Sequence, residues 1–218
     1  MGASVDGAYP PGVPEDLLVS QLGQVPYDRA LAWQTELRER VIAGTAQEAL
    51  LVLEHPAAYT LGRRSQPGDL PMGEDWYRAQ GIDVMRTDRG GKLTYHGPGQ
   101  LVGYPIVRIA SVPDHVCAIE RALKAALAEE GIEGHGGEHA GVWVGERKIA
   151  SIGIHVSRGV AMHGFALNVD NDLQPFEWAV ACGLPETQMT SVCRETGRTG
   201  AGPALAGHIA ASLVPSLA

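Results

Sequence analysis

The sequence predicts one α+β domain in which helices pack on a mixed, largely antiparallel sheet. First, the 218 residues are 44% hydrophobic and 19% charged, which is typical of a folded chain with a substantial core. Second, helical and strand patterns alternate with no internal repeat and no linker long enough to divide the chain. Third, several strands in the second half follow one another directly, which favours antiparallel pairing over a doubly wound parallel sheet.

The N-terminal residues carry no clear pattern of secondary structure. Residues 1–15 contain no Lys or Arg and have three prolines where a secretory signal would be apolar. No apolar run approaches the roughly 18 residues that span a bilayer. We therefore expect a flexible tail over residues 1–16, a folded domain over residues 17–218, and a cytoplasmic protein.

Helices and strands alternate through the first half of the domain. In the segment 26–43, Leu31, Leu37 and Val41 recur at helical spacing, and Gly44 can end the helix. A helix over 113–130 has Asp114 near its start. The remaining patterns predict strands over 17–20, 49–54, 59–61, 82–86 and 101–107, and a short helix over 74–80.

The second half begins with a hairpin pattern. Two runs with a period of two flank Gly145-Glu146, which is a turn signature between antiparallel strands. A third strand over 160–169 makes the group a meander, and a helix over 203–213 follows.

The most informative segment is 89–105, which holds five glycines and two prolines. Glycine allows positive φ angles and close approach to the backbone, at a cost in chain entropy. These glycines surround Arg89, Lys92, Thr94, Tyr95, His96 and Gln100, so the segment is interpreted as a binding site. A glycine-rich surface loop is the alternative interpretation.

The net charge of −8 argues against nucleic acid as the main partner. Basic residues nevertheless gather near the glycine-rich segment and predict a basic face that suits an acidic macromolecular substrate. Ordinary solvated charge explains them equally well. They are Arg63, Arg64, Arg86, Arg89, Lys92, Arg147, Lys148 and Arg158.

Two residues have the chemistry of a nucleophilic site. The three cysteines form no Cys-x-x-Cys pair, which argues against a disulfide framework. Cys182 precedes Gly183, so its thiol and the next backbone N–H are unobstructed, and a nearby lysine ammonium would favour its thiolate. Lys148, at the head of an apolar strand, is the candidate. Taken singly, Cys182 fits a buried small apolar residue and Lys148 a strand-end lysine that reaches water.

Cys117, in a predicted helix, is expected to pack against the core.

Five segments, in order along the chain, resemble the motifs of octanoyltransferases, the lipoyl(octanoyl) transferases of lipoate biosynthesis. They are EHPAAYTLGRR at 54–64, RGGKLTYHGPGQLVGYP at 89–105, KIASIGIH at 148–155, HGFALN at 163–168 and ACGL at 181–184. The resemblance implies a fold like that of biotin and lipoate protein ligases, with residues 17–218 as the catalytic domain. It also implies a thioester nucleophile at Cys182 and a pKa-lowering or acid–base lysine at Lys148. Many members have proline before the cysteine, where this chain has Ala181.

The same resemblance implies an acyl-binding set. It comprises Arg89, Gly90, Gly91, Lys92, Leu93, Thr94, Tyr95, His96, Ser151, Ile152, Gly153, Gly164, Phe165 and Ala166. His155 is added to this set; it and His96 could hydrogen-bond to the acyl carbonyl, shape the pocket or be structural. No cofactor is expected, and no metal, because the GHGGEH motif at 134–139 lacks the His-Glu-x-x-His spacing and a fourth ligand.

The resemblance implies octanoyl-acyl carrier protein as the donor. It implies as acceptors the lipoyl domains of 2-oxoacid dehydrogenase complexes and the glycine cleavage H protein, with neither nucleic acid nor membrane as a partner. Two alternatives remain: an ATP-dependent lipoate or biotin protein ligase, and a non-catalytic module that binds a carrier protein. A ligase that forms an adenylate needs no cysteine nucleophile, so Cys182 favours the transferase.

Overall fold

A computed structural model describes residues 17–137, 139–179 and 187–217. The predicted tail over 1–16 and the predicted nucleophile Cys182 lie outside the described residues. The elements are β1 (Leu17–Gln24), α1 (Tyr27–Ile42), β2 (Glu48–Glu54), β3 (Ala58–Leu61), α2 (Glu74–Ala79), β4 (Asp83–Arg86), β5 (Leu93–His96), β6 (Gln100–Ile106), α3 (Val112–Glu129), β7 (Gly141–Val144), β8 (Arg147–Ser157), β9 (Val160–Asn168), α4 (Val192–Thr196) and α5 (Gly202–Leu217), with short 3₁₀ turns at Pro67–Asp69 and Gln174–Phe176.

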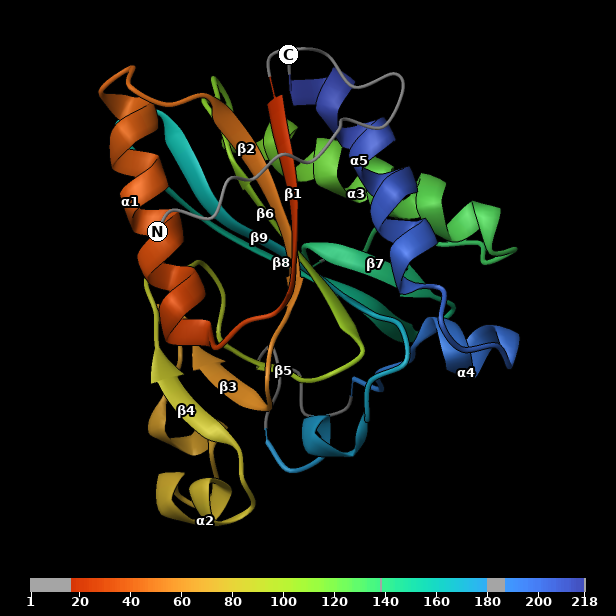
Figure 1. Ribbon diagram of the computed structural model, residues 1–218. Coiled ribbons are helices and arrows are strands. Elements are labelled where there is room, and N and C mark those ends of the chain that lie inside the picture. Colours follow the sequence, from red (N-terminus) through yellow and green to blue (C-terminus); the bar gives the residue numbers. More distant parts are fainter. Residues whose placement is uncertain (1–16, 138, 180–186, 218) are drawn as a thin grey trace.

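The described residues form a six-stranded sheet in the order β1-β2-β6-β9-β8-β7 (Figure 1). Strands β1 and β2 are parallel, and the other neighbours in this sheet are antiparallel. The α+β class and the mixed, largely antiparallel sheet are therefore confirmed. The predicted meander is β7-β8-β9, and its first turn contains Gly145, which has a φ of 56°.

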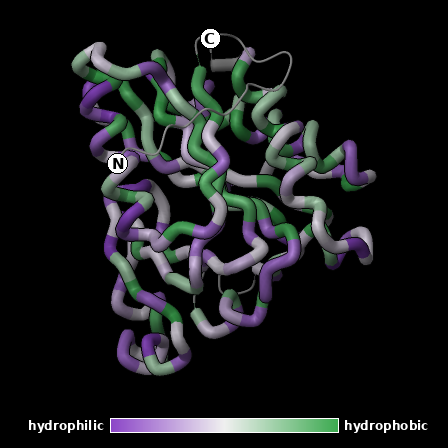
Figure 2. The backbone as a smooth tube through the Cα atoms, in the orientation of Figure 1, coloured by the Kyte–Doolittle hydropathy of each residue, from purple (hydrophilic) through white to green (hydrophobic). Residues whose placement is uncertain are grey.

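Helices cover both faces of this sheet. Helix α1 packs against β6 and β9 on one face, while α3 and α5 pack on each other and on the opposite face (Figure 1). Each face has its own apolar core. Figure 2 shows hydrophobic residues concentrated along the central strands and hydrophilic residues on the outer turns of α1.

A second, three-stranded sheet in the order β4-β3-β5 lies beside the large one. Strand β3 is parallel to β4 and antiparallel to β5. Helix α2 contacts β4, and Tyr59, Tyr77 and Tyr95 form a third core with Phe176 at this end of the molecule. The sequence patterns predicted β3 and β4 but neither β5 nor the separation into two sheets.

The helix boundaries follow from capping groups. Helix α1 ends at Ile42, and Gly44, whose φ is 71°, adopts the left-handed conformation and donates to Val41 O, which confirms the predicted stop. Helix α3 begins after Ser111, whose Oγ accepts from the backbone N–H of Asp114. Helix α4 was not predicted.

The expectation that Cys117 packs against the core is wrong. Cys117 is exposed, because α3 buries its Ala118, Ile119, Ala122, Leu123, Ala126 and Leu127 against the sheet and α5. Among the described residues, no helix combines the length and apolar character that crossing a membrane requires.

Candidate active site

A cavity of about 340 Å³ lies where the two sheets meet. Its wall comes from β5, β8, β9 and the loop before β5, with Tyr27 of α1, Tyr104 of β6 and Val112 and Val116 of α3. Residues that are far apart in the sequence, from Tyr27 to Ala166, therefore meet at one site.

Glycines allow these segments to approach each other closely. In the β8–β9 ladder, Gly153 stands opposite Gly164, so residues 151–153 and 164–166 are paired along their whole length. Gly90 N donates to Ile154 O at 2.9 Å, and a Cβ on Gly153 would lie 3.0 Å from Gly90 O. A Cβ on Gly164 would collide with Gly103 O. Larger residues at these positions would force the loop and strands apart.

Arg89 fixes the loop before β5 to the small sheet. Its side chain is buried, and Nη2 donates to Thr60 O at 2.5 Å and to Thr60 Oγ1 at 2.8 Å. Nη1 donates to Gly90 O at 3.0 Å. Arg89 thus lines the cavity and also determines the position of the glycine-rich loop.

A buried hydrogen-bond network determines the tautomer of His96. Gln100 Nε2 donates to Tyr95 O at 3.1 Å and to Asn168 Oδ1 at 2.9 Å. Gln100 Oε1 must therefore be the group 2.8 Å from His96 Nδ1, which makes Nδ1 the donor. Burial, and then the neighbouring His55, hold the pKa of His96 well below its usual range. The ring is neutral, so its Nε2 is a hydrogen-bond acceptor.

His55 and Tyr104 form a separate hydrogen-bonded pair, and the ring of His55 contacts that of His96 edge-on. His55 Nδ1 lies 2.6 Å from Val25 O and donates to it, so His55 Nε2 accepts from the Tyr104 hydroxyl at 2.7 Å. Burial lowers the pKa of His55 to about 4. The floor of the cavity therefore carries no net charge from these rings at neutral pH.

His163 and Asp88 form a second polar pair at the cavity. His163 has a φ of 60° although it is not glycine, and its backbone N–H donates to Gln34 Oε1 rather than to a neighbouring strand. Its Nε2 donates to Asp88 Oδ1 at 2.7 Å. This hydrogen bond lowers the pKa of Asp88 to about 2, while burial lowers the pKa of His163. The pair is thus a carboxylate bound to a neutral imidazole.

Lys148, on β8, lines the cavity with only 2% of its surface exposed. Its Nζ lies 5.4 Å from the centroid of the Trp143 ring, a geometry that favours an ammonium. A Cβ on Gly141 would lie 2.7 Å from Lys148 Cε, and Gly141 has a φ of 142°. Glycine at 141 therefore provides the space that the lysine side chain occupies.

The backbone of Lys148 binds the chain that follows Cys182. Lys148 N donates to Gln188 O at 2.9 Å, and Thr190 N donates to Lys148 O at 2.9 Å. Asn168 Nδ2 donates to Thr190 O at 3.0 Å, which links this segment to the network of His96. Residues 188–190 are thus fixed beside the lysine.

Most of the residues predicted to bind the acyl group line this one cavity. They are Arg89, Gly90, Gly91, Lys92, Leu93, Thr94, His96, Ser151, Ile152, Gly153, Gly164, Phe165 and Ala166. Tyr95 and His155 do not line it: Tyr95 packs on Tyr59 and Phe176, and His155 lies against Asp88, with Nδ1 3.2 Å from Asp88 O. A role in binding stays a prediction for the whole set.

The predicted basic face is smaller than expected, because three of its members pair with carboxylates of this chain. Arg86 binds Glu74 at 3.2 Å, Arg147 binds Glu195 at 3.0 Å, and Arg158 binds Glu39. The basic side chains that line the cavity are Arg63, Arg64, Arg89, Lys92 and Lys148.

Comparison with known proteins identifies the family. The sequence profile of the lipoyl protein ligase A/B catalytic domain matches residues 26–211. The octanoyltransferase of Mycobacterium ulcerans is 46% identical over 194 residues, which cover 83% of this chain and 80% of that protein. The octanoyltransferase of Solibacter usitatus is 48% identical over 179 residues, covering 79% and 81%. The chain belongs to the octanoyltransferases. It is therefore an acyltransferase that transfers octanoyl groups in lipoate biosynthesis.

Solved structures share the fold at low sequence identity. A bipartite lipoate protein ligase from Thermoplasma acidophilum superposes with a TM-score of 0.71 at 15% identity, covering 93% of this chain and 84% of that one. A biotin protein ligase from Aquifex aeolicus has a TM-score of 0.57 at 14% identity, covering 92% and 70%. The predicted resemblance to the fold of biotin and lipoate ligases is confirmed.

For this octanoyltransferase, sequence reasoning missed two groups of residues at the site. His163 and Asp88 line or adjoin the cavity as a pair, but only the histidine lies in a segment that carried the family resemblance. Asn168 and Thr190 join the network of His96 to the segment beside Lys148. Neither link could be inferred from spacing, because each joins residues that are distant in sequence.

Proposed function

We propose that this octanoyltransferase takes its acyl group from octanoyl-acyl carrier protein and delivers it to a lysine of lipoyl domains through a thioester on Cys182. The acceptors are the lipoyl domains of 2-oxoacid dehydrogenase complexes and the glycine cleavage H protein. The main support is the position of Lys148, whose side chain lines the cavity and whose backbone binds the chain at 188–190 that follows Cys182.

The first half-reaction exchanges one thioester for another. The Cys182 thiolate attacks the octanoyl carbonyl and its sulfur forms the new C–S bond. The bond to the carrier's sulfur breaks, and the leaving thiolate takes its proton from the Lys148 ammonium, which becomes neutral. A lysine ammonium beside the nucleophile stabilises the thiolate by charge. The Trp143 ring lies close to Lys148 Nζ, which favours the ammonium form that this role requires.

In the second half-reaction, the neutral amine of the acceptor lysine attacks the Cys182 thioester. A C–N bond forms, the C–S bond breaks, and the amine loses one proton. Lys148 in its neutral form accepts that proton, and Cys182 is released. The two steps together convert a thioester and an amine into an amide and a thiol.

The cavity provides the binding energy that positions the carbonyl. Ile152, Phe165, Leu93 and the glycines of β8 and β9 offer an apolar wall for an extended chain. Burial of an alkyl chain yields about 0.8 kcal/mol per methylene. An octanoyl chain therefore gains several kcal/mol, which can be used to orient the reacting carbon.

Intact-mass spectrometry tests this proposal. The protein is mixed with octanoyl-acyl carrier protein in the absence of ATP, and we expect a mass increase of one octanoyl group. Cys182→Ala should show no adduct, and Lys148→Ala should form it at least about a hundredfold more slowly. Cys117→Ala, which removes an exposed cysteine of α3, is the matched control and should form the adduct normally.

Two results would contradict the proposal. An absolute requirement for ATP would indicate a ligase that activates a free acid, and normal transfer to a lipoyl domain by Cys182→Ala would exclude the thioester intermediate.

The location of the protein in the cytoplasm stays a prediction.

A further inference from the structure

Three cationic residues on two neighbouring segments of the backbone line one cavity. Arg63 and Arg64, which directly follow β3 and Gly62, are exposed, and Lys92 is half-buried. Backbone hydrogen bonds hold their two segments together: Arg63 N donates to Arg89 O and Arg64 N to Gly91 O, each at 3.1 Å, and Gly62 N donates to Lys92 O at 3.2 Å. We call Arg63, Arg64 and Lys92 the rim cations.

The rim cations differ from most arginines of this protein. In the part of the chain that the structure describes, none of the three forms an ion pair. The chain has 25 carboxylate residues against 17 Lys and Arg, so partners are abundant. Seven other arginines do pair with carboxylates: Arg38, Arg40, Arg78, Arg86, Arg147, Arg158 and Arg198. An anion bound in this cavity would therefore meet three positive charges that no carboxylate of the described residues neutralises.

We propose that the rim cations bind the phosphodiester of the prosthetic arm that carries the donor's thioester. This inference rests on the proposed carrier-protein donor, whose acyl group is attached through a phosphorylated pantetheine arm. A phosphate oxygen pair matches the fork of an arginine guanidinium, and a lysine adds a third donor. The acyl chain would lie in the cavity and the phosphate at its rim, so the donor is held on both sides of its thioester.

The position of the rim cations favours the arm over the acidic surface of a carrier protein. They line the same cavity as the apolar wall, so the anion that they meet enters together with the acyl chain. A broad acidic surface would instead need a broad basic face. Three arginines that could have extended such a face, Arg86, Arg147 and Arg158, are already paired within the chain.

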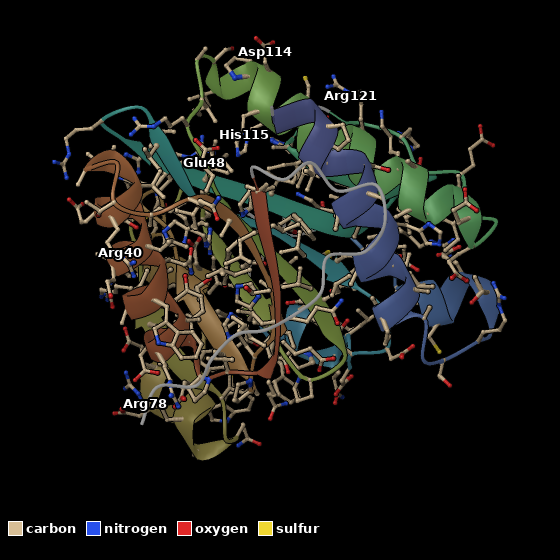
Figure 3. The ribbon with its side chains drawn as sticks, turned by 45° about the horizontal axis from the view of Figure 1, so that its top comes forward. Arg40, Glu48, Arg78, Asp114, His115 and Arg121 are labelled. Carbon is tan, nitrogen blue, oxygen red and sulfur yellow. The ribbon has the colours of Figure 1, made fainter. Side chains whose placement is uncertain are left out.

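The test compares two small donors that differ only in the phosphate: S-octanoyl-4′-phosphopantetheine and S-octanoyl-pantetheine. The unaltered protein should prefer the phosphorylated donor, and we expect Arg63→Ala combined with Arg64→Ala to lower kcat/KM for it by about ten- to a hundredfold, mainly through KM. The same variant should use S-octanoyl-pantetheine within about twofold of the unaltered protein. Arg121→Ala is the matched control, since Arg121 is exposed on the outer side of α3, away from the cavity (Figure 3).

Three outcomes overturn the inference. The first is equal use of both small donors by the unaltered protein, and the second is an equal loss of activity with both by the double variant. The third is a double variant that loses activity with octanoyl-acyl carrier protein but keeps it with both small donors. The last result would assign the rim to the carrier's protein surface. Failure of the proposed function is distinguishable, because the unaltered protein would then accept the octanoyl group from none of the three donors.

A binding measurement makes the inference independent of how well the variant folds. By calorimetry, the unaltered protein should bind 4′-phosphopantetheine at least about tenfold more tightly than pantetheine, and added salt should reduce that difference. Equal affinities would contradict the inference.

Discussion

His96 is held in one chemical form by its neighbours. Because Gln100 Oε1 accepts a hydrogen bond from Nδ1–H and burial keeps the ring neutral, Nε2 has no proton to give. His96 therefore cannot donate to an acyl carbonyl, which removes one of the roles that its motif suggested. It can accept a hydrogen bond from an N–H group, such as the amine of an acceptor lysine.

Nitrogen-15 NMR of the histidine rings checks this form. We expect the His96 Nδ1 resonance to be that of a protonated nitrogen and Nε2 that of a bare one, with no titration around pH 6.5, where an ordinary histidine titrates. In Gln100→Glu, a carboxylate would face Nδ1–H, and its negative charge should raise the pKa of His96. A ring protonated at Nε2, or one that titrates in this range without the substitution, would show that the network is assigned incorrectly.

The β8–β9 ladder shows how a binding segment can also be structural. Gly164 lies on the cavity wall, but a Cβ there would meet the backbone of Gly103 on β6 and lie 2.6 Å from Pro105 Cδ. The close approach of β9 to β6 therefore depends on glycine at this position. Because β9 forms part of the cavity wall, the contact between β9 and β6 also affects the position of that wall.

We expect Gly164→Ala to destabilise the protein by about 2 kcal/mol or more, because two backbones must separate. It should also raise KM for the octanoyl donor. Gly207→Ala is the matched control: no atom lies within 4 Å of its Cβ position, and alanine in helix α5 should stabilise by about 0.5–1 kcal/mol. Urea unfolding measures both changes. If the two variants have equal free energies of unfolding, β9 can move away from β6 without loss of stability, and the prediction is wrong.

Elements with a strong local pattern could be predicted from the sequence. Helix α3 has a capping serine and a continuous apolar face, and β7 and β8 flank a glycine turn. Strand β5 was missed because its four residues lie between Gly91 and Gly97, and its pairing with β3 is not local. Helix α4 has both a Ser191 cap and Gly197, but its five residues are too few to form a periodic pattern.

The site could be predicted only where residues cluster in sequence. The glycine-rich motifs identified the cavity wall, since each brings several lining residues together in one segment. Ion pairing could not be foreseen: Arg158 meets Glu39 of α1, which is 119 residues away. The positive φ of His163 and its bond to Asp88 likewise depend on how α1 and the loop before β5 pack on β9.

At the scale of the whole molecule, the described residues include four histidines that are buried and neutral. Burial is the main cause of a lowered pKa for His55, His96, His115 and His163. For His55 and His115, the pKa falls to about 4. His115, on α3, differs from the others in having no hydrogen-bond partner for either ring nitrogen among the described residues.

These histidines make the folded state sensitive to acid. In the unfolded chain, a histidine binds a proton as the pH falls through about 6.5, whereas the buried ring stays neutral until a lower pH. The unfolded state then binds more protons, so the free energy of unfolding falls with pH by up to about 1.4 kcal/mol per pH unit for each such ring. Asp88, whose pKa is about 2, adds a loss only as the pH falls from about 4 toward 2.

His115→Leu isolates one of these contributions. The substitution replaces a buried ring that lacks a hydrogen-bond partner in the described structure with an apolar side chain, so we expect no loss of stability at pH 7.5. Between pH 7.5 and pH 5, the unaltered protein should lose about 2 kcal/mol more unfolding free energy than the variant, because only its unfolded state gains the His115 proton. Urea unfolding at several pH values, followed by tryptophan fluorescence, measures this difference. If the two proteins lose stability in parallel, His115 takes up its proton equally in the folded and unfolded states, and the acid sensitivity must come from the remaining buried rings.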